Sequence, residues 1–377
     1  MKILYLHNAE YNSNMANLIQ VKAMCKAMSE LNGDVTLSLQ RSNKNINAPA
    51  IDEYPYSIDI RKPLINNKKI DKYINVCSVK KTIHKVNPDI IYLRNPLLLK
   101  QVKNSKKPFV IELHNNKLHQ GYGWLNKYWH RFLIKMSKTS QVLRIVCISE
   151  ALKNYWINRG IPSNKLIVAH DGIDQNVFHK NISKYVARRK LGLPVEKQIV
   201  TYTGRLYKNR KIENIITLAD KFRKVHFLLV GGPDEQSNAY KNMAESNEIK
   251  NITFTGQIPH EQIPDYLFAS DVLLGLWSSD VPTINYCSPL KVFEYMAAGR
   301  IIIAHAFPTI KEVLRHNYNA LLAKPDSLEE LTKRTKEALE GNYPSSIEAQ
   351  ARKDVFTHYT WKQRARHILS EIETKKV

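Results

Sequence analysis

The hydrophobic positions in the first half of this chain form short apolar runs separated by longer segments of helical or basic character. A helical pattern covers about residues 16–31, between the first two runs. The apolar runs are KILYL (2–6), DVTLSLQ (34–40), DIIYLR (89–94), FVIELH (109–114) and RIVCIS (144–149). Strands that alternate with helices in this way predict a parallel sheet covered by helices on both faces.

The same alternation begins again in the second half of the chain, after a polar hinge at about 171–185. Its apolar runs are QIVTYTGRL (198–206), VHFLLVGG (225–232), ITFTGQI (252–258), DVLLGLW (271–277) and RIIIAHA (300–306). A helix is predicted over 212–223, and a last basic helix over 361–376 has no strand after it. We therefore expect two α/β domains, with ligands outside the carboxyl ends of their strands.

Length and composition agree with two soluble domains. A chain of 377 residues is too long for one ordinary core. No apolar run reaches the roughly 18 to 20 residues that a membrane-spanning helix needs. The N-terminus loses its apolar character too soon for a secretory signal. Four scattered cysteines have no spacing typical of a metal site or a disulfide framework, so a reducing cytoplasm is expected.

Charge adds a possible partner. The net charge is +23, and residues 61–107 contain thirteen Lys or Arg against two acidic residues. Such a cluster is typical of an anionic partner, either nucleic acid or a membrane surface, although it can also be a solvated face. The segment 124–140 interleaves aromatic and basic residues, which fits either core packing with a basic outer face or a helix that docks on anionic lipid.

One acidic residue stands out in the stretch NYCSPLKVFEYMAAGRIII (285–303). Glu294 lies in the middle of an apolar helical pattern that follows a Ser-Pro corner. Burying a carboxylate is costly unless it is hydrogen-bonded. The pattern therefore predicts that Glu294 binds something.

Several segments, in this order, resemble glycosyltransferase family 4, the retaining enzymes of the GT-B fold. They are IVCISEALKNYW (145–156), KLIVAHDGIDQNVF (165–178), YTGRLYKNRKIENII (202–216), NITFTGQIPHEQIPDYLFASDVLL (251–274), SPLKVFEYMAAGRIII (288–303) and YTWKQRARHIL (359–369). The resemblance implies two Rossmann-like, doubly wound domains that face a central cleft. It assigns residues 1–175 to the acceptor side, completed by a crossing helix at 358–377, and residues 176–357 to the nucleotide-sugar donor.

The resemblance also implies roles for residues of the donor domain. Glu294 would accept hydrogen bonds from the ribose hydroxyls, and the N–H groups of Leu290 and Lys291 would bind the diphosphate at a helix N-terminus. Arg205 and Arg210 would neutralise the charge that develops on the departing diphosphate. Ile258 would lie next to the base.

In the first domain, the resemblance implies that His114 is the catalytic histidine that faces the sugar. Ala16 would offer its N–H to the donor phosphate, although Met15 replaces a glycine common in relatives. A second family glutamate, which contacts the transferred sugar, is replaced by Tyr286. Recognition of the donor sugar is therefore expected to be rearranged around Asn285 and Tyr286, with Asp280 or backbone groups as further possibilities.

The function implied is transfer of a hexosyl or N-acetylhexosaminyl group, with retention of configuration, from a nucleotide sugar in which uracil is the favoured base. The expected acceptor is lipid-linked or a surface glycan under assembly, with no obligatory metal and no other cofactor. We expect a cytoplasmic protein, peripheral at the inner face of the cell membrane through anionic lipid, that does not bind nucleic acid. Two alternatives stay open: a GT-B scaffold that has lost catalysis, and a basic nucleic-acid-binding protein.

Overall fold

The protein divides into two compact units. The computed structural model describes residues 1–10, 16–40, 54–61, 68–119, 122–179, 182–281 and 283–374. Unit 1 comprises Met1–Asp171 and Trp361–Val377, and unit 2 comprises Gly172–Thr360. These limits lie a few residues from the predicted ones at 175 and 358. The last helix of the chain belongs to unit 1, as the GT-B resemblance implied.

Unit 1 is built on one parallel sheet. Its strand order is β3-β2-β1-β4-β5-β6-β7, so the order reverses between β1 and β4. Neighbouring strands pair in parallel throughout. The strands are β1 (Ile3–Glu10), β2 (Val35–Gln40), β3 (Ser57–Arg61), β4 (Ile90–Leu93), β5 (Phe109–Leu113), β6 (Val142–Cys147) and β7 (Leu166–Val168).

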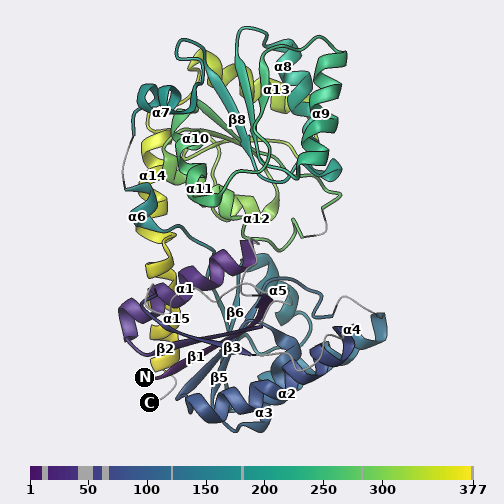
Figure 1. Ribbon diagram of the computed structural model, residues 1–377, viewed down its shortest axis with the longest axis vertical. Coiled ribbons are helices and arrows are strands. Elements are labelled where there is room, and N and C mark those ends of the chain that lie inside the picture. The colour runs from purple at the N-terminus through teal and green to yellow at the C-terminus, as the bar shows by residue number, and fades with distance from the viewer. Residues whose placement is uncertain are drawn as a thin grey trace. The chain divides into compact units, whose positions relative to one another are not determined.

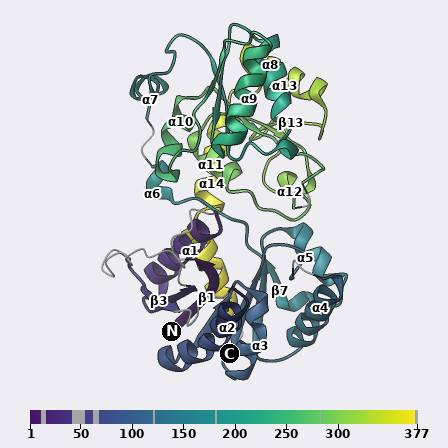
Figure 2. The same cartoon turned by 45° about the vertical axis from the view of Figure 1, so that its right-hand side comes forward.

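Helices connect and cover these strands. Two of them, α1 and α15, come from opposite ends of the chain and lie side by side in unit 1 (Figures 1 and 2). The helices of this unit are α1 (Ala16–Asn32), α2 (Lys68–Val86), α3 (Leu99–Asn104), α4 (Gly123–Ser137), α5 (Glu150–Ile157) and α15 (Trp361–Glu373). The packing of α15 against the N-terminal helix explains why the C-terminal segment completes this unit.

Unit 2 repeats the architecture with strand order β10-β9-β8-β11-β12-β13, again parallel. Its strands are β8 (Ile199–Thr203), β9 (His226–Val230), β10 (Ile252–Phe254), β11 (Val272–Gly275), β12 (Ile301–His305) and β13 (Leu321–Ala323). Its helices are α6 (Gln175–Phe178), α7 (Lys184–Leu191), α8 (Ile212–Lys221), α9 (Asp234–Ser246), α10 (Ile263–Ala269), α11 (Leu290–Ala298), α12 (Pro308–Lys311), α13 (Leu328–Glu340) and α14 (Ile347–His358).

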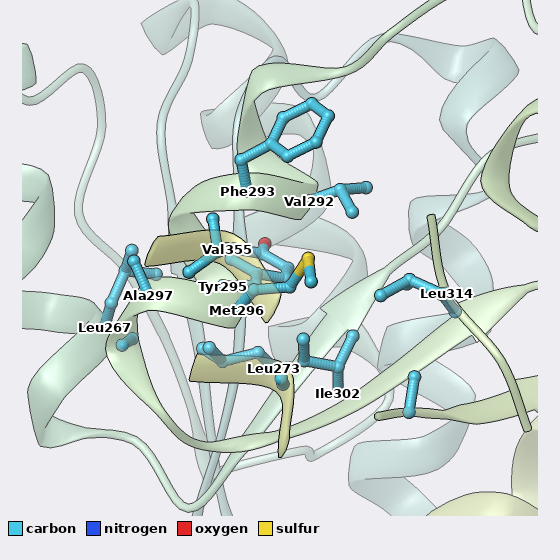
Figure 3. Close-up of a cluster of buried hydrophobic side chains, with 14 of the residues drawn as sticks. Leu267, Leu273, Val292, Phe293, Tyr295, Met296, Ala297, Ile302, Leu314 and Val355 are labelled. Atoms are coloured by element: carbon cyan, nitrogen blue, oxygen red, sulfur yellow. The ribbon is translucent and has the colours of Figure 1, made fainter. Parts of the chain in front are cut away.

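The core on one face of the unit 2 sheet is built around α11 (Figure 3). Phe293, Tyr295 and Met296 of this helix are fully buried. They pack with Leu273 of β11 and Ile302 of β12, and with side chains of α10 and α14. This packing fixes α11, and its polar residue Glu294 lies on the strip of the helix that the core does not cover.

The apolar runs predicted the central strands well and missed three edge strands. The missed strands are β3, β7 and β13, each at an outer position of its sheet. The hydrophobic signal of these strands is weak, because β7 and β13 have only three residues each and polar residues interrupt the apolar ones in β3. No helix among the described residues combines the length and the apolar character that crossing a bilayer requires.

Candidate functional site

In unit 2 the candidate site begins at the loop that leaves β8. Gly204 has φ +126°, and Gly231 after β9 has φ +134°. A Cβ at Gly231 would lie 2.1 Å from the carbonyl oxygen of Gly204. Two backbone hydrogen bonds join the loops, from Gly204 N to Val230 O (2.8 Å) and from Leu206 N to Gly232 O (3.0 Å). Because the loops touch through backbone alone, they hold Arg205 at the carboxyl end of the sheet.

The N-terminus of α11 follows at the same edge. Pro289 precedes the helix with extended backbone and has no N–H. Leu290 and Lys291 are therefore the first residues of α11 with an N–H group, and these N–H groups have no acceptor within the helix. A helix N-terminus of this kind has a positive dipole end and free donors, which suit a phosphate group. This is the role that the resemblance implied for both residues.

The side chain of Lys291 folds back toward β8. Its Nζ donates to Thr203 O at 2.5 Å and lies 4.0 Å from the centre of the Tyr202 ring. Burial, with the nearby charge of Arg210, lowers the pKa of Lys291 to about 7. A Cβ at Gly204 would lie 3.0 Å from Nζ, so the glycine leaves room for this contact. Lys291 can therefore gain or lose its charge near neutral pH, and it lies next to the loop that carries Arg205.

Glu294, one turn further along α11, has a defined partner. Its Oε1 lies 2.8 Å from Nε2 of His260, and its side chain is 13% exposed. The hydrogen bond with Glu294 raises the pKa of His260 above its usual value. His260 itself is nearly half exposed. A hydroxyl-bearing ligand can therefore replace His260 on Glu294 without leaving the carboxylate unpaired.

The other predicted donor residues lie around this edge. Arg205 is exposed, and its Nη1 donates to the Tyr207 hydroxyl at 2.6 Å. Arg210 is half-buried and ends a short 3₁₀ turn. Ile258 is half-buried and packs against the buried cluster of Ile199, Leu228 and Val230.

The residues predicted for the donor sugar lie in the turn that precedes α11. Asn285 is exposed and Tyr286 is half-buried. The Tyr286 N–H donates to Thr283 O at 3.0 Å. Asp280, the further possibility, pairs with Lys211 at 3.1 Å. The structure thus gives Asn285 and Tyr286 positions close in sequence to the α11 N-terminus, and their contact with a sugar stays a prediction.

In unit 1 the candidate site centres on His114, which directly follows β5. Its Nε2 lies 2.5 Å from Oε1 of Glu112 and 2.9 Å from Nε of Arg94. Glu112 is fully buried, whereas the His114 side chain is 24% exposed. Glu112 and His114 lie on the same side of the strand because side chains alternate. The sequence had indicated a structural role for Glu112, and its position beneath His114 fits that role.

Glu112 is the anionic centre of a buried network. Arg364 of α15 approaches it with Nη2 at 3.3 Å, and Tyr92 donates its hydroxyl to Oε2. Burial alone would raise the pKa of Glu112, but Arg364, with His114 and Arg94, holds it well below the usual value. Glu112 is therefore ionised at neutral pH.

Burial and the charge of Arg94 decide the protonation of His114, against the opposing effect of the ionised Glu112. Burial, with the charge of Arg94, lowers the pKa of His114 to about 4, so the imidazole is neutral at pH 7. A neutral imidazole has one donor and one acceptor nitrogen; here Nε2 lies between Oε1 of Glu112 and the donating Nε of Arg94, and Nδ1 lies 3.4 Å from Nη2 of Arg94. Such a group can accept a hydrogen bond from a hydroxyl, which is chemistry that a sugar ligand requires.

The remaining predicted residue of unit 1 is Ala16, which begins α1. Met15 lies outside the described residues. In the described ranges, no group of three or more His, Cys, Asp or Glu side chains could hold a metal ion. Metal independence stays a prediction.

The sequence did not single out His260, Arg94 or Arg364. His260 follows Ile258 by two residues, and Arg94 ends an apolar run that was predicted as a strand. Both therefore had a detectable signal, namely a polar residue at the carboxyl end of a strand or in the loop after it. Arg364 had none, because its partner Glu112 is distant in sequence.

Two family models match this chain. Residues 183–354 match the model described as Glycosyl transferases group 1, and residues 19–177 match the model described as Glycosyltransferase Family 4. The first match lies within unit 2, and the second lies mostly within unit 1. Both halves of the chain are thus recognised in the order expected of such proteins.

Curated relatives resemble parts of the chain. An uncharacterized glycosyltransferase of Methanocaldococcus jannaschii, MJ1607, is 20% identical over 240 residues, which are 62% of this chain and 60% of the relative. The alpha-galactosylglucosyldiacylglycerol synthase of Streptococcus pneumoniae is 24% identical over 177 residues, which are 45% of this chain and 46% of the relative. The chain thus aligns with less than two thirds of the length of these relatives.

A solved structure resembles the whole chain. HepE of Anabaena, crystallised in complex with UDP and glucose, matches with a TM-score of 0.75 and 17% identity over 99% of this chain and 100% of that chain. At this level of identity the likeness establishes the fold and leaves the ligands to be argued from the residues.

Proposed function

Because this chain belongs to glycosyltransferase family 4 and has the GT-B fold, we propose that it transfers a sugar from a nucleoside diphosphate sugar to an acceptor. The observation that carries the proposal is the α11 N-terminus of unit 2. There, two N–H donors, the Lys291 cation and the Glu294 carboxylate lie within five residues, and Arg205 and Arg210 follow the neighbouring strand β8. This set suits a diphosphate joined to a ribose. UDP is the favoured nucleotide, in keeping with the UDP bound by HepE.

The proposed chemistry retains the configuration of the sugar and needs no metal. The guanidinium groups of Arg205 and Arg210 would stabilise the negative charge that develops on the departing diphosphate. His114, neutral and oriented by Glu112, would accept a hydrogen bond from the reacting sugar while positive charge develops on the sugar ring. The transferred group would be hexosyl or N-acetylhexosaminyl.

The donor site gives the first test. Glu294→Ala and Arg205→Ala should each weaken binding of UDP by about 1.5 to 3 kcal/mol, because each removes a charge-assisted hydrogen bond. Neither change should unfold unit 2, since Arg205 is exposed and Glu294 lies outside the core. Isothermal titration calorimetry with UDP measures the affinity, and melting temperature checks the fold.

Glu261→Ala is the matched control for this test, because Glu261 is an exposed acid next to His260 and should leave UDP affinity unchanged. Unchanged affinity in both Glu294→Ala and Arg205→Ala would place the nucleotide site elsewhere.

For the acceptor, we propose a lipid-linked or surface glycan that the protein meets at an anionic membrane on the cytoplasmic side. The support is the outer face of α4. Trp124 and Tyr128 are 67% and 42% exposed, while Met136 is buried. Lys127, Arg131 and Lys135 are exposed on the same helix. Exposed aromatic and basic side chains on one helix suit the interface of an anionic bilayer. The relative from Streptococcus pneumoniae is named for a glycolipid product.

The membrane proposal predicts binding to vesicles of phosphatidylcholine with phosphatidylglycerol that weakens as salt rises, because salt screens exposed charges over about 8 to 10 Å. Replacing Lys127, Arg131 and Lys135 together by glutamate should abolish most of this binding in a sedimentation assay. The same number of charge reversals at exposed lysines of unit 2, such as Lys221, Lys241 and Lys250, is the control. Equal binding to neutral and anionic vesicles would contradict the proposal.

A further inference from the structure

The chain that follows β5 is held by helix α4. Residues 115–119, the post-β5 segment, begin directly after His114. Asn126 Oδ1 of α4 accepts from the N–H groups of Leu118 at 3.0 Å and His119 at 3.2 Å. One amide side chain of the helix thus fixes two successive peptide groups of the post-β5 segment, and a single substitution can release both.

A second residue of α4 makes a third contact with the same segment. His130 Nε2 lies 2.9 Å from the carbonyl oxygen of Asn116. A carbonyl oxygen only accepts, so Nε2 carries a proton and donates. His130 lies four residues after Asn126, so the two side chains are on the same face of the helix. That face continues into the buried residues Leu133 and Ser137. The inner face of α4 therefore joins the core of unit 1 to the post-β5 segment.

The opposite face of α4 is the one proposed above to contact the membrane. At about 100° per residue, its positions fall on the side of the helix opposite Asn126 and His130. The residues of this outer face are all exposed and are Trp124, Lys127, Tyr128, Arg131 and Lys135. The helix lies at the periphery of unit 1 (Figures 1 and 2). One helix thus presents the proposed membrane face on one side and holds the post-β5 segment on the other.

The first turns of α4 have few anchors of their own. The buried residues of the helix are Leu133, Met136 and Ser137, all in its second half. Tyr122, which precedes the helix, makes no side-chain hydrogen bond that caps it, and the first turn contains no acidic residue. A helix end without a cap or a favourable charge frays more readily. The order of these turns is therefore sensitive to what contacts the outer face.

We propose that Asn126 and His130 are positioning residues that couple docking of α4 on an anionic membrane to the order of the chain at His114. Docking of the outer face restricts the first turns of α4, and their hydrogen bonds then restrict the post-β5 segment. Membrane binding thus supplies the free energy for this ordering. The inference rests on the membrane contact and the glycosyltransferase function proposed above. It adds that the site of unit 1 becomes ordered where a lipid-linked acceptor is found.

Hydrogen exchange of the full-length protein tests this coupling, with and without vesicles of phosphatidylcholine and phosphatidylglycerol. The readout is the ratio of exchange rates without and with vesicles. For the amides of Leu118 and His119 we expect a ratio of about five or more, because their hydrogen bonds to Asn126 open less often on the membrane. In Asn126→Leu the ratio should fall to about one, while sedimentation with vesicles is unchanged. Asn126→Asp keeps an acceptor oxygen and should restore the ratio.

This ratio separates positioning from a purely structural role, which would change protection equally with and without vesicles and leave the ratio as in the wild type. His130→Leu removes the hydrogen bond to Asn116 and should also lower the ratio, which keeps the test valid if Asn126→Leu fails to fold. Asn154→Leu makes the same change at an exposed position of α5 and is the matched control, with the wild-type ratio expected.

Sedimentation with vesicles but no change of exchange in the post-β5 segment would overturn the inference. A wild-type ratio in both Asn126→Leu and His130→Leu would also overturn it. Failure of the proposed function has a different signature. If the wild-type protein does not sediment with anionic vesicles, the membrane contact is wrong and the coupling with it. If it does not bind UDP, the donor assignment is wrong, whereas vesicle-dependent exchange still reports on the coupling.

Discussion

His114→Ala is expected to lower the single-turnover rate of sugar transfer about a hundredfold while the affinity for UDP changes little. A hundredfold loss corresponds to about 2.7 kcal/mol, a modest demand on one hydrogen bond made in the transition state. Apart from the N–H of Ala16, the nucleotide contacts expected here belong to unit 2, whereas His114 belongs to unit 1. A loss of rate without a loss of nucleotide affinity is the pattern of an interaction made chiefly in the transition state.

His170→Ala provides the control for this experiment. His170 follows β7, and burial lowers its pKa to about 4, as for His114. Its ring bonds to the backbone of Ile148, so its loss should reduce stability and leave the rate per folded molecule nearly unchanged. Melting temperature, UDP affinity and rate are measured on the same preparations. If His114→Ala behaves like His170→Ala, then His114 is a structural residue.

The pH dependence of the rate gives an independent reading of the same site. The pKa of His114 is lowered to about 4, so the neutral, accepting form is present throughout the neutral range and is lost only when pH falls toward 4. The rate should therefore be insensitive to His114 between about pH 6 and 8. A step in rate near the ordinary histidine pKa would indicate another group, and His260, whose pKa is raised by Glu294, is then the residue to examine.

The sequence predicted the central strands because each is a continuous apolar run. β8, β9, β11 and β12 have neighbours on both sides and helices on both faces, so nearly every side chain in them is buried. β3 has a different pattern, SIDIR, in which polar residues interrupt the apolar ones. This strand ends at Arg61, and no role was predicted for that residue from the sequence. The failure to predict the strand thus removed the signal that a basic residue lies at the carboxyl end of the sheet.

The candidate site shows the same division between local and distant information. Glu294 was identified from the sequence because a lone acid in an apolar helix is conspicuous over a few residues. Its partner His260 lies in a polar loop, where a histidine does not differ from the surrounding pattern. The Glu112 network is harder still, because Arg364 reaches it from the C-terminal helix. Only the packing of α15 in unit 1 brings these charges together, and no local pattern records it.

The network around Glu112 leads to the largest expected effect on stability. Arg364→Met should destabilise unit 1 by about 3–5 kcal/mol, because it leaves a buried carboxylate without its main counter-charge. Arg364 is 4% exposed and also donates from Nε to His170 O at 3.0 Å. Hydrogen exchange of peptides from β4 and β5 measures the loss, because these strands carry Tyr92 and Glu112. Glu371 lies on the same helix as Arg364 and forms a more exposed ion pair with Arg144 of β6. Glu371→Gln should therefore cost about 1 kcal/mol or less.

A second substitution separates the loss of charge pairing from the loss of packing. In the double variant Arg364→Met with Glu112→Gln, the buried charge is gone, so the destabilisation should be smaller than the sum of the single effects. The pH dependence follows from the same pairing. In the wild-type protein the pKa of Glu112 lies below 4.5, so its contribution to stability is present above pH 4.5 and is lost as pH falls through the folded-state pKa. Without Arg364, burial raises that pKa instead, so the variant is penalised most at neutral pH, and the gap to the wild type narrows as pH falls through the raised pKa of the variant toward the lowered pKa of the wild type. A gap that stays constant with pH, together with additive single effects, would mean that Arg364 stabilises unit 1 through its packing and backbone contacts and not through Glu112.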